Sequence, residues 1–238
     1  MNNISFEINE NNKNEICIII QGPINYQWLC EIKKKYKNCN IPMIFSTWKG
    51  EENKFSKNDI TLFNTIPMIK GKQNVMLQQL STYNGILLAK DLGYKYAIKI
   101  RSDMIFTDIN KFLELDIDYD KLNFLFFLDY YRKEHNKQYK YFCDYIQISS
   151  INNLLKLWNF DYNDDCKYPE ELITKNVFKE FQIENISTAI ATLRKLRLDI
   201  NDDSIKKGIT KIENIARFQE IKKGKLKNLC KNNKIYIE

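Results

Sequence analysis

The sequence predicts an α/β fold in which a mixed, mostly parallel central sheet is flanked by helices. Three observations predict it. A continuous apolar run over residues 15–20 has the pattern of a strand that is covered on both faces. An amphipathic segment and a second apolar run follow it through short loops. A long helical pattern over 74–92 and a further strand over 96–100 then repeat the alternation of helix and strand.

The first elements are bounded by breaks in the apolar pattern. The strand over 15–20 ends at Gln21-Gly22-Pro23, since glycine and proline end regular structure. Apolar side chains recur at helical spacing over 28–36, which predicts a short helix. Two more strands are expected, over 41–46 and 60–64. The opening of the chain therefore indicates strand, helix and strand, with right-handed crossovers.

The helix over 74–92 has two different faces and ends at Gly93. Its apolar side chains are Met76, Leu80, Tyr83 and Leu87. Small and amide-bearing side chains recur at the same spacing, namely Asn74, Gln78, Ser81, Thr82, Gly85 and Ala89. Lys and Glu would be expected on a solvated face. The second face therefore indicates close approach to a neighbouring strand or to a ligand.

The later elements follow from the same patterns. Strands are expected over 122–128 and 142–149 and at the C-terminal Lys-Ile-Tyr-Ile, and helices over 151–159, 169–181 and 187–196. No internal repeat and no linker rich in Gly, Pro or Ser divides the chain. We therefore expect one domain over residues 1–238. The polar segment 1–14 is expected to be a flexible end or a first weak strand.

Composition excludes several classes of protein. Hydrophobic residues make up 44% of the 238 residues, which is too many for a disordered chain. No apolar run approaches the ~20 residues of a membrane span, and the N-terminus lacks the pattern of a signal peptide. We therefore expect a cytoplasmic protein. Six cysteines without a Cys-x-x-Cys pair, with the single His135, do not form a zinc pattern and are interpreted as reduced thiols.

The formal charge of +7 has two interpretations. Excess lysines on solvated faces would explain it without any partner. The other interpretation is attraction to anions, such as nucleotide diphosphates or the acidic inner surface of a membrane. Binding of nucleic acid would rest on net charge alone, since no recognition motif accompanies it. We therefore do not expect a nucleic-acid partner.

Two polar segments end the first predicted strands, where open α/β sheets bind ligands. Gly22, between Gln21 and Pro23, would let the backbone approach a ligand, or it forms an ordinary tight turn. Thr47 and Trp48 could line a pocket for a base or ribose, or Trp48 caps the core. Neither segment matches a P-loop or a Gly-x-Gly-x-x-Gly motif.

The strand over 96–100 continues into Arg101-Ser102-Asp103. Alternation places Lys99, Arg101 and Asp103 on one side of this strand. A carboxylate at the tip of a central strand can hold Mg²⁺ or Mn²⁺ against a diphosphate, and two basic groups beside it favour the same anion. The alternative is a surface ion pair between Arg101 and Asp103.

The order of these segments resembles the WavE-type lipopolysaccharide-synthesis family of glycosyltransferases. The matching residues are Gln21, Gly22, Pro23, Ser46, Thr47, Trp48, Asn74, Gln78, Gln79, Ser81, Thr82, Gly85, Lys99, Arg101, Ser102, Asp103, Asp144, Pro169 and Glu170. The resemblance spans residues 16–181. It implies a GT-A-like fold, with a nucleotide-binding sheet region over 15–149 and acceptor-side helices and a tail over 150–238.

The resemblance also implies an activity and roles for single residues. It implies transfer of a sugar from a nucleotide-sugar donor to a lipopolysaccharide or capsular polysaccharide. The donor would bind Gln21, Gly22, Pro23, Thr47, Trp48, Asn74, Gln78, Lys99, Arg101 and Asp103. Asp103 would hold Mn²⁺ or Mg²⁺. Members of this fold class commonly carry Asp-x-Asp, and Arg101 stands at the first position here, which leaves metal dependence open.

The acceptor side would use Asp144 or Glu170. Either carboxylate could orient or deprotonate the attacking hydroxyl, while Arg101 stabilises the leaving diphosphate. Pro169-Glu170 is also an ordinary helix start, and Asp144 also fits a turn. The expected acceptor is an oligosaccharide or a lipid-linked sugar, with peripheral association with the inner membrane or with other polysaccharide-synthesis enzymes. The alternatives are a phosphosugar transferase or nucleotidyltransferase, and a non-catalytic module that binds carbohydrate or a partner.

Overall fold

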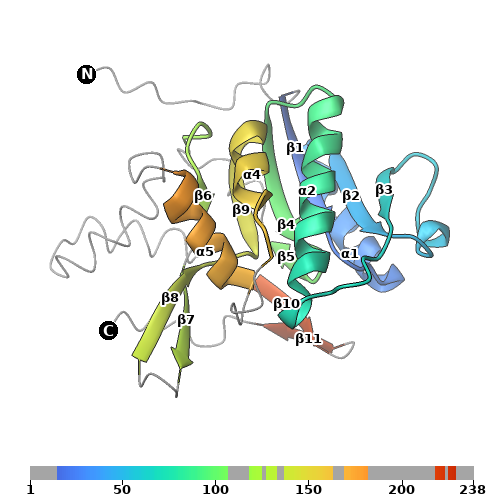
Figure 1. The fold of residues 1–238 in the computed structure, drawn as a ribbon. Coiled ribbons are helices and arrows are strands. Elements are labelled where there is room, and N and C mark those ends of the chain that lie inside the picture. The colour runs from blue at the N-terminus through green and yellow to red at the C-terminus, as the bar shows by residue number, and fades with distance from the viewer. Residues whose placement is uncertain are drawn as a thin grey trace, which may run out of the picture.

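A computed structural model describes residues 15–106, 118–124, 127–132, 137–162, 169–181, 218–222 and 225–228. Its six-stranded central sheet has the order β3-β2-β1-β4-β9-β6 (Figure 1). The strands are β1 (Ile16–Gln21), β2 (Met43–Trp48), β3 (Ile60–Asn64), β4 (Tyr96–Arg101), β6 (Asn123–Phe124) and β9 (Ile146–Ser150). The first four are parallel, while β9 is antiparallel to both β4 and β6. The predicted mixed, mostly parallel sheet is confirmed.

Helices cover both faces of this sheet, as predicted. The α-helices are α1 (Tyr26–Tyr36), α2 (Val75–Asp91), α4 (Ile151–Trp158) and α5 (Pro169–Glu180), and short 3₁₀ turns are η2 (Lys37–Cys39), η3 (Glu52–Lys54) and η4 (Lys72–Asn74). Figure 1 shows α2 and α4 on one face and α1 behind the other. Ile18 and Ile98 belong to the core under α1, whereas Cys17 and Ala97 belong to the core under α2 and α4. Successive strand residues therefore alternate between two cores.

Local sequence explains where α1 begins. The side chain of Asn25 accepts a hydrogen bond of 3.1 Å from the backbone N–H of Trp28, which caps the first turn. Three lysines occupy the last turn, where the negative end of the helix dipole favours cations. The apolar face of the helix, with Trp28 and Ile32, is buried against β1. The pattern over 28–36 thus predicted the helix, and the Asn25 cap extends it by two residues.

The small face of α2 lies directly on the sheet. Ser81 and Thr82 are fully buried, as is Ala89. A Cβ added at Gly85 would lie only 2.9 Å from Ile19 Cγ2 and from Ser46 Cβ. Of the two predicted reasons for this face, the structure shows close approach to neighbouring strands.

Two smaller sheets complete the described fold. β5 (Met104–Phe106), β10 (Phe218–Lys222) and β11 (Lys225–Asn228) form one, and β7 (Phe127–Arg132) pairs with β8 (Lys137–Phe142) in the other. The single strand predicted over 122–128 was wrong, because its residues contribute to β6 and β7, which lie in different sheets. The strand predicted over 142–149 is divided at 143–145, where Asp144 turns its side chain toward Arg101.

Several predictions fall outside the described residues. They are the character of segment 1–14, the helix over 187–196 and the C-terminal strand, and His135 also lies there. Within the described part of the chain, no helix combines the length and the apolar character needed to cross a bilayer.

Candidate functional site

The carboxyl ends of four parallel strands meet at one edge of the sheet. This carboxyl edge, the lower one in Figure 1, consists of the ends of β1, β2, β3 and β4 and the loops that follow them. Open α/β sheets bind ligands at such an edge because the loops are free to vary while the strands are rigid. Most residues predicted to bind the donor lie at this edge or just behind it.

The turn after β1 packs closely on the turn after β4. Gly22 has a φ of +110°, and a Cβ added there would lie 2.9 Å from Ser102 Oγ. The backbone N–H of Ser102 donates to the Gln21 carbonyl at 2.8 Å, and its hydroxyl donates to the Pro23 carbonyl at 2.7 Å. The Gly22 N–H donates to the Ser46 carbonyl of β2 at 3.0 Å. Packing of the strand ends therefore requires the glycine, as the tight-turn interpretation expected.

Arg101 joins two carboxylates at the end of β4. Its Nε donates to Asp103 Oδ1 at 2.9 Å and its Nη2 to Asp103 Oδ2 at 2.7 Å, a bidentate pair. Its Nη1 donates to Asp144 Oδ2 at 3.1 Å. The guanidinium also lies 5.2 Å from the centroid of the Tyr145 ring. We call Arg101, Asp103 and Asp144 the arginine clamp.

Burial differs sharply across the arginine clamp. The Asp144 side chain is fully buried, Arg101 is 22% exposed and Asp103 is 36% exposed. Burial alone would lower the pKa of the Arg101 guanidinium, but the charges of Asp144 and Asp103 raise that pKa well above its usual value. Arg101 is thus a permanent cation between an inner carboxylate, Asp144, and an outer one, Asp103.

Lys99 lies beneath the arginine clamp. It is fully buried, and its ammonium donates to the backbone carbonyl of Asp144. Its Nζ also lies 4.7 Å from the Trp158 ring centroid, a cation–π contact. Burial lowers the pKa of Lys99 to about 8, although the charge of Asp144 opposes that shift. Lys99 shares a side of β4 with Arg101, as alternation predicted, and supports the segment around Asp144.

The charges at the end of β4 balance one another. Lys99 and Arg101 contribute +2, and Asp103 and Asp144 contribute −2, so the four groups sum to zero. Glu170, buried at the start of α5, lies close enough to contribute to the raised pKa of the Cys143 thiol, after burial and the charge of Asp144. An anionic ligand would therefore meet no net positive charge here unless it brought a cation.

Gln21 belongs to a polar network between β1, β2 and α2. Its Oε1 accepts from Ser81 Oγ at 2.7 Å, and Ser46 Oγ donates to the Ser81 carbonyl at 2.6 Å. Asn64, at the end of β3, donates to Ser46 Oγ at 3.0 Å and to the Thr47 carbonyl at 2.8 Å. These bonds connect three strand ends through one helix, so they hold the shape of the carboxyl edge.

Glu51 organises the loop after β2. It accepts from Thr47 Oγ1, from the Ile24 N–H at 3.2 Å and from Lys54 Nζ at 2.7 Å. Trp48 is only 6% exposed, which agrees with the interpretation that it caps the core. Thr47 and Trp48 thus lie behind the surface of the carboxyl edge. No sequence motif marked Glu51, because its partners are 3 to 27 residues away.

The first half of α2 carries two buried polar atoms that form no hydrogen bond with the described residues. Gln78 Oε1 and Thr82 Oγ1 are buried and have no hydrogen-bond partner among the described residues. Asn74, which precedes α2, is exposed and has a left-handed φ of 58°. Buried polar atoms of this kind usually bind water or a ligand. The helix therefore offers hydrogen-bonding groups within one turn of Ser81, which contacts Gln21.

The residues of the clamp limit how a metal could bind. No group of three or more His, Cys, Asp or Glu within the described ranges could hold a metal ion. Mg²⁺ in nucleotide enzymes often needs only one or two carboxylates, because the phosphates supply further oxygens. Asp103, one partly exposed carboxylate, fits a divalent ion that arrives with a diphosphate better than a resident metal.

The structure brings together Arg101 and Asp103 with Asp144, which lies 43 residues away from Arg101 in sequence. Glu170, at the start of α5, lies near Cys143, the neighbour of Asp144. It places Gln21, Gly22 and Pro23 beside them through Ser102. Sequence reasoning gave no role to Ser102 or Tyr145. The position of Ser102 between Arg101 and Asp103 could have indicated its role at the strand end. The contact of Tyr145 with Arg101 could not be predicted, because it depends on the pairing of β4 with β9.

Comparison of the sequence with protein-family models and with curated proteins gives no match in either case. The resemblance to the WavE-type family therefore stays a prediction from motif order.

Proposed function

We propose that the chain is a GT-A-like glycosyltransferase that moves a sugar from a nucleotide-sugar donor to a growing lipopolysaccharide or capsular polysaccharide. The observation that carries this proposal is the arginine clamp. It presents one oriented, partly exposed carboxylate, Asp103, at the carboxyl ends of β1 and β4. That is the place where open α/β sheets bind nucleotides.

Asp103 is the residue that would receive the diphosphate with its cation. A divalent ion there would bridge the two phosphates and neutralise charge on the leaving nucleoside diphosphate. Arg101 keeps Asp103 in one orientation through two hydrogen bonds, and Asp144 anchors Arg101 from below. The turn at Gly22 packs on Ser102, the residue before Asp103.

The remaining charged residues have different roles in this proposal. Asp144 is fully buried and bonded to Arg101, so it acts as a positioning residue. Lys99, also buried, supports the same segment through the Asp144 carbonyl. Glu170 is the carboxylate that would accept the proton of the attacking sugar hydroxyl. Gln78 and Asn74 supply hydrogen-bonding groups toward the donor from the start of α2.

Product analysis tests the proposal. The chain is incubated with a panel of nucleotide sugars, Mn²⁺ and a bacterial glycolipid extract as acceptor, and the released nucleotide is identified by chromatography. A glycosyltransferase releases a nucleoside diphosphate. Release of a nucleoside monophosphate or of pyrophosphate would instead identify a phosphosugar transferase or a nucleotidyltransferase. A donor that binds without turnover in any mixture would favour a non-catalytic binding module.

A further inference from the structure

Exposed apolar side chains gather at the carboxyl edge. Five large hydrophobic side chains in the described segments are exposed: Tyr26 (64%), Ile66 (51%), Met68 (101%), Ile69 (69%) and Leu92 (49%). Tyr26 begins α1 just after the turn that follows β1, and the next three lie in the loop between β3 and η4. Only Leu92, at the end of α2, lies at the opposite edge. The clustering is therefore specific to the edge that holds the arginine clamp.

The loop over 65–71 is held at its end rather than free. Its last residue, Gly71, has a φ of +69°, and a Cβ added there would lie 2.9 Å from the Tyr162 ring. The Lys72 N–H donates to Tyr162 Oη at 3.0 Å, and the Met76 N–H donates to the Lys70 carbonyl at 3.0 Å. The loop is thus fastened to the start of α2 and to the segment after α4, while its apolar side chains point away from the core.

Lysines lie at both ends of this loop. Lys49 follows β2, and its N–H donates to the carbonyl of Asn64, the last residue before the loop, at 2.9 Å. Lys70 and Lys72 are exposed at the end of the loop. Neither Lys49 nor Lys70 forms an ion pair with a residue that the structure describes. One exposed carboxylate, Glu52, lies nearby and accepts from the Gly50 N–H at 2.7 Å.

We propose that the loop over 65–71 docks the protein on an anionic membrane surface. Met68 and Ile69 would insert among the acyl chains, and Lys49 and Lys70 would contact acidic headgroups. The net charge of +7 favours the same partner. Three protruding side chains are too few for the ~800 Å² per partner of a stable protein interface. Two copies of this basic loop would also repel one another.

This docking would turn the carboxyl edge, with Asp103, toward the bilayer. A lipid-linked acceptor would then meet the site without leaving the membrane. That consequence rests on the proposed glycosyltransferase function, whereas vesicle binding by the loop does not.

Co-sedimentation of the full chain with vesicles tests the proposal. We expect binding to vesicles of equal parts phosphatidylcholine and phosphatidylglycerol, but not to phosphatidylcholine alone, and weaker binding at high salt. The double variant Met68→Ser/Ile69→Ser should lower binding at least about tenfold, since it removes two apolar side chains from the bilayer. Leu92→Ser, which removes an exposed leucine (49%) at the opposite edge, should have no effect.

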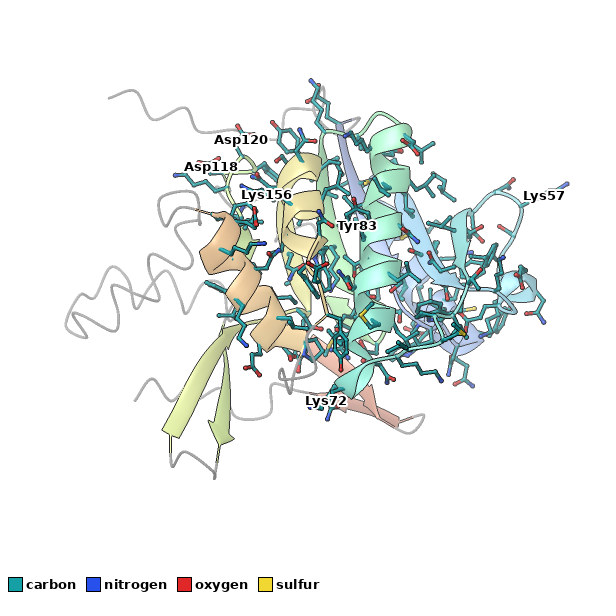
Figure 2. All side chains as sticks on the ribbon, viewed as in Figure 1. Lys57, Lys72, Tyr83, Asp118, Asp120 and Lys156 are labelled. Carbon is teal, nitrogen blue, oxygen red and sulfur yellow. The ribbon has the colours of Figure 1, made fainter. Side chains whose placement is uncertain are left out.

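The lysines are tested in the same assay. Lys49→Gln/Lys70→Gln should lower binding to the anionic vesicles by about fivefold per lysine. The control is Lys57→Gln, because Figure 2 shows Lys57 projecting far from Lys72. All of these positions are exposed, so a thermal midpoint for each variant should match that of the wild-type chain.

Three results would overturn the proposal. They are no binding of the wild-type chain to either vesicle, equal binding of wild type and Met68→Ser/Ile69→Ser, or a dimer in solution that this double variant dissociates. The last result would identify a second copy as the partner. Thermal shifts with nucleotides, measured on the same double variant, should match those of wild type. A failure of nucleotide binding would therefore leave the membrane result standing.

Discussion

Arg101 binds Asp103 through two hydrogen bonds, 2.9 Å from Nε and 2.7 Å from Nη2, while its Nη1 lies 3.1 Å from Asp144 Oδ2. One guanidinium therefore connects a strand-end carboxylate to a buried carboxylate 43 residues away. An isolated surface ion pair would contribute little to stability. Here the inner partner is fully buried, so the arrangement has consequences that can be measured.

Removal of the Arg101 guanidinium should destabilise the fold, because it leaves the buried Asp144 carboxylate without its cation. We expect Arg101→Met to lower the free energy of unfolding by about 3–5 kcal/mol, measured by urea denaturation. The double variant Arg101→Met/Asp144→Leu should recover most of that loss, since it removes both charges. A loss below about 1 kcal/mol for the single variant would show that water already solvates Asp144.

Close packing at the strand ends should make substitution of Gly22 more destabilising than substitution of Gly50, which has a similar backbone conformation. Gly22 and Gly50 both have positive φ, +110° and +95°, but only at Gly22 would a Cβ meet another atom, Ser102 Oγ. Gly50→Ala should lower the free energy of unfolding by about 1 kcal/mol, from backbone strain alone. Gly22→Ala should lower the free energy of unfolding by about 1–3 kcal/mol more, because its Cβ would be packed too closely against Ser102 Oγ. Equal shifts in urea midpoint for the two variants would show that Ser102 moves away freely.

Burial of Lys99 should make stability depend on pH. Its pKa is lowered from 10.5 to about 8 in the folded chain, chiefly by burial. Between these pH values the unfolded chain holds a proton that the folded chain has released, so stability rises with pH. We expect the free energy of unfolding to rise by about 3 kcal/mol over this window, relative to Lys99→Met. A difference between the two proteins that is constant with pH would contradict the shift.

The sequence predicted the elements that depend on local pattern. A continuous apolar run predicted β1, and a shorter apolar segment that contains Lys99 predicted β4. Both faces of these two strands are buried. Helical spacing predicted α1, α2, α4 and α5 to within a few residues. The small face of α2 was also correctly linked to close packing, as Gly85 shows against Ile19 and Ser46. The sequence did not predict that residues 122–149 form the strands β6, β7, β8 and β9, which pair in two different sheets. The pairing of strands depends on a register that leaves no local signal.

The site was predicted in part for the same reason. Alternation placed Lys99 and Arg101 on one side of β4, which the structure confirms. It could not show that Lys99 is fully buried, because that depends on Trp158 of α4 lying over it. The pairing of Arg101 with Asp144 depends on the antiparallel register of β4 and β9. The role of Glu51 was not predicted, because a carboxylate that follows a glycine is common in solvent-exposed loops.

The role of Asp103 can be tested against a matched carboxylate. Asp118 is 46% exposed, close to the 36% of Asp103, and it pairs with Lys121 at 3.3 Å. Figure 2 shows Asp118 far from Lys72, which lies at the carboxyl edge. Asp103→Asn and Asp118→Asn thus remove the same charge from comparable surfaces, and only the first should affect a ligand at the ends of β1 and β4.

The most direct measurement is a thermal-shift series with nucleoside diphosphates, each with and without Mn²⁺, on wild type and these two variants. We expect one nucleotide to stabilise wild type with Mn²⁺ by about 2.7 kcal/mol at a hundredfold excess over Kd. Asp103→Asn should lose the Mn²⁺-dependent part of the shift, and Asp118→Asn should keep it. A shift with Mn²⁺ that Asp103→Asn leaves unchanged, or no shift with any nucleotide, would contradict the proposed diphosphate site.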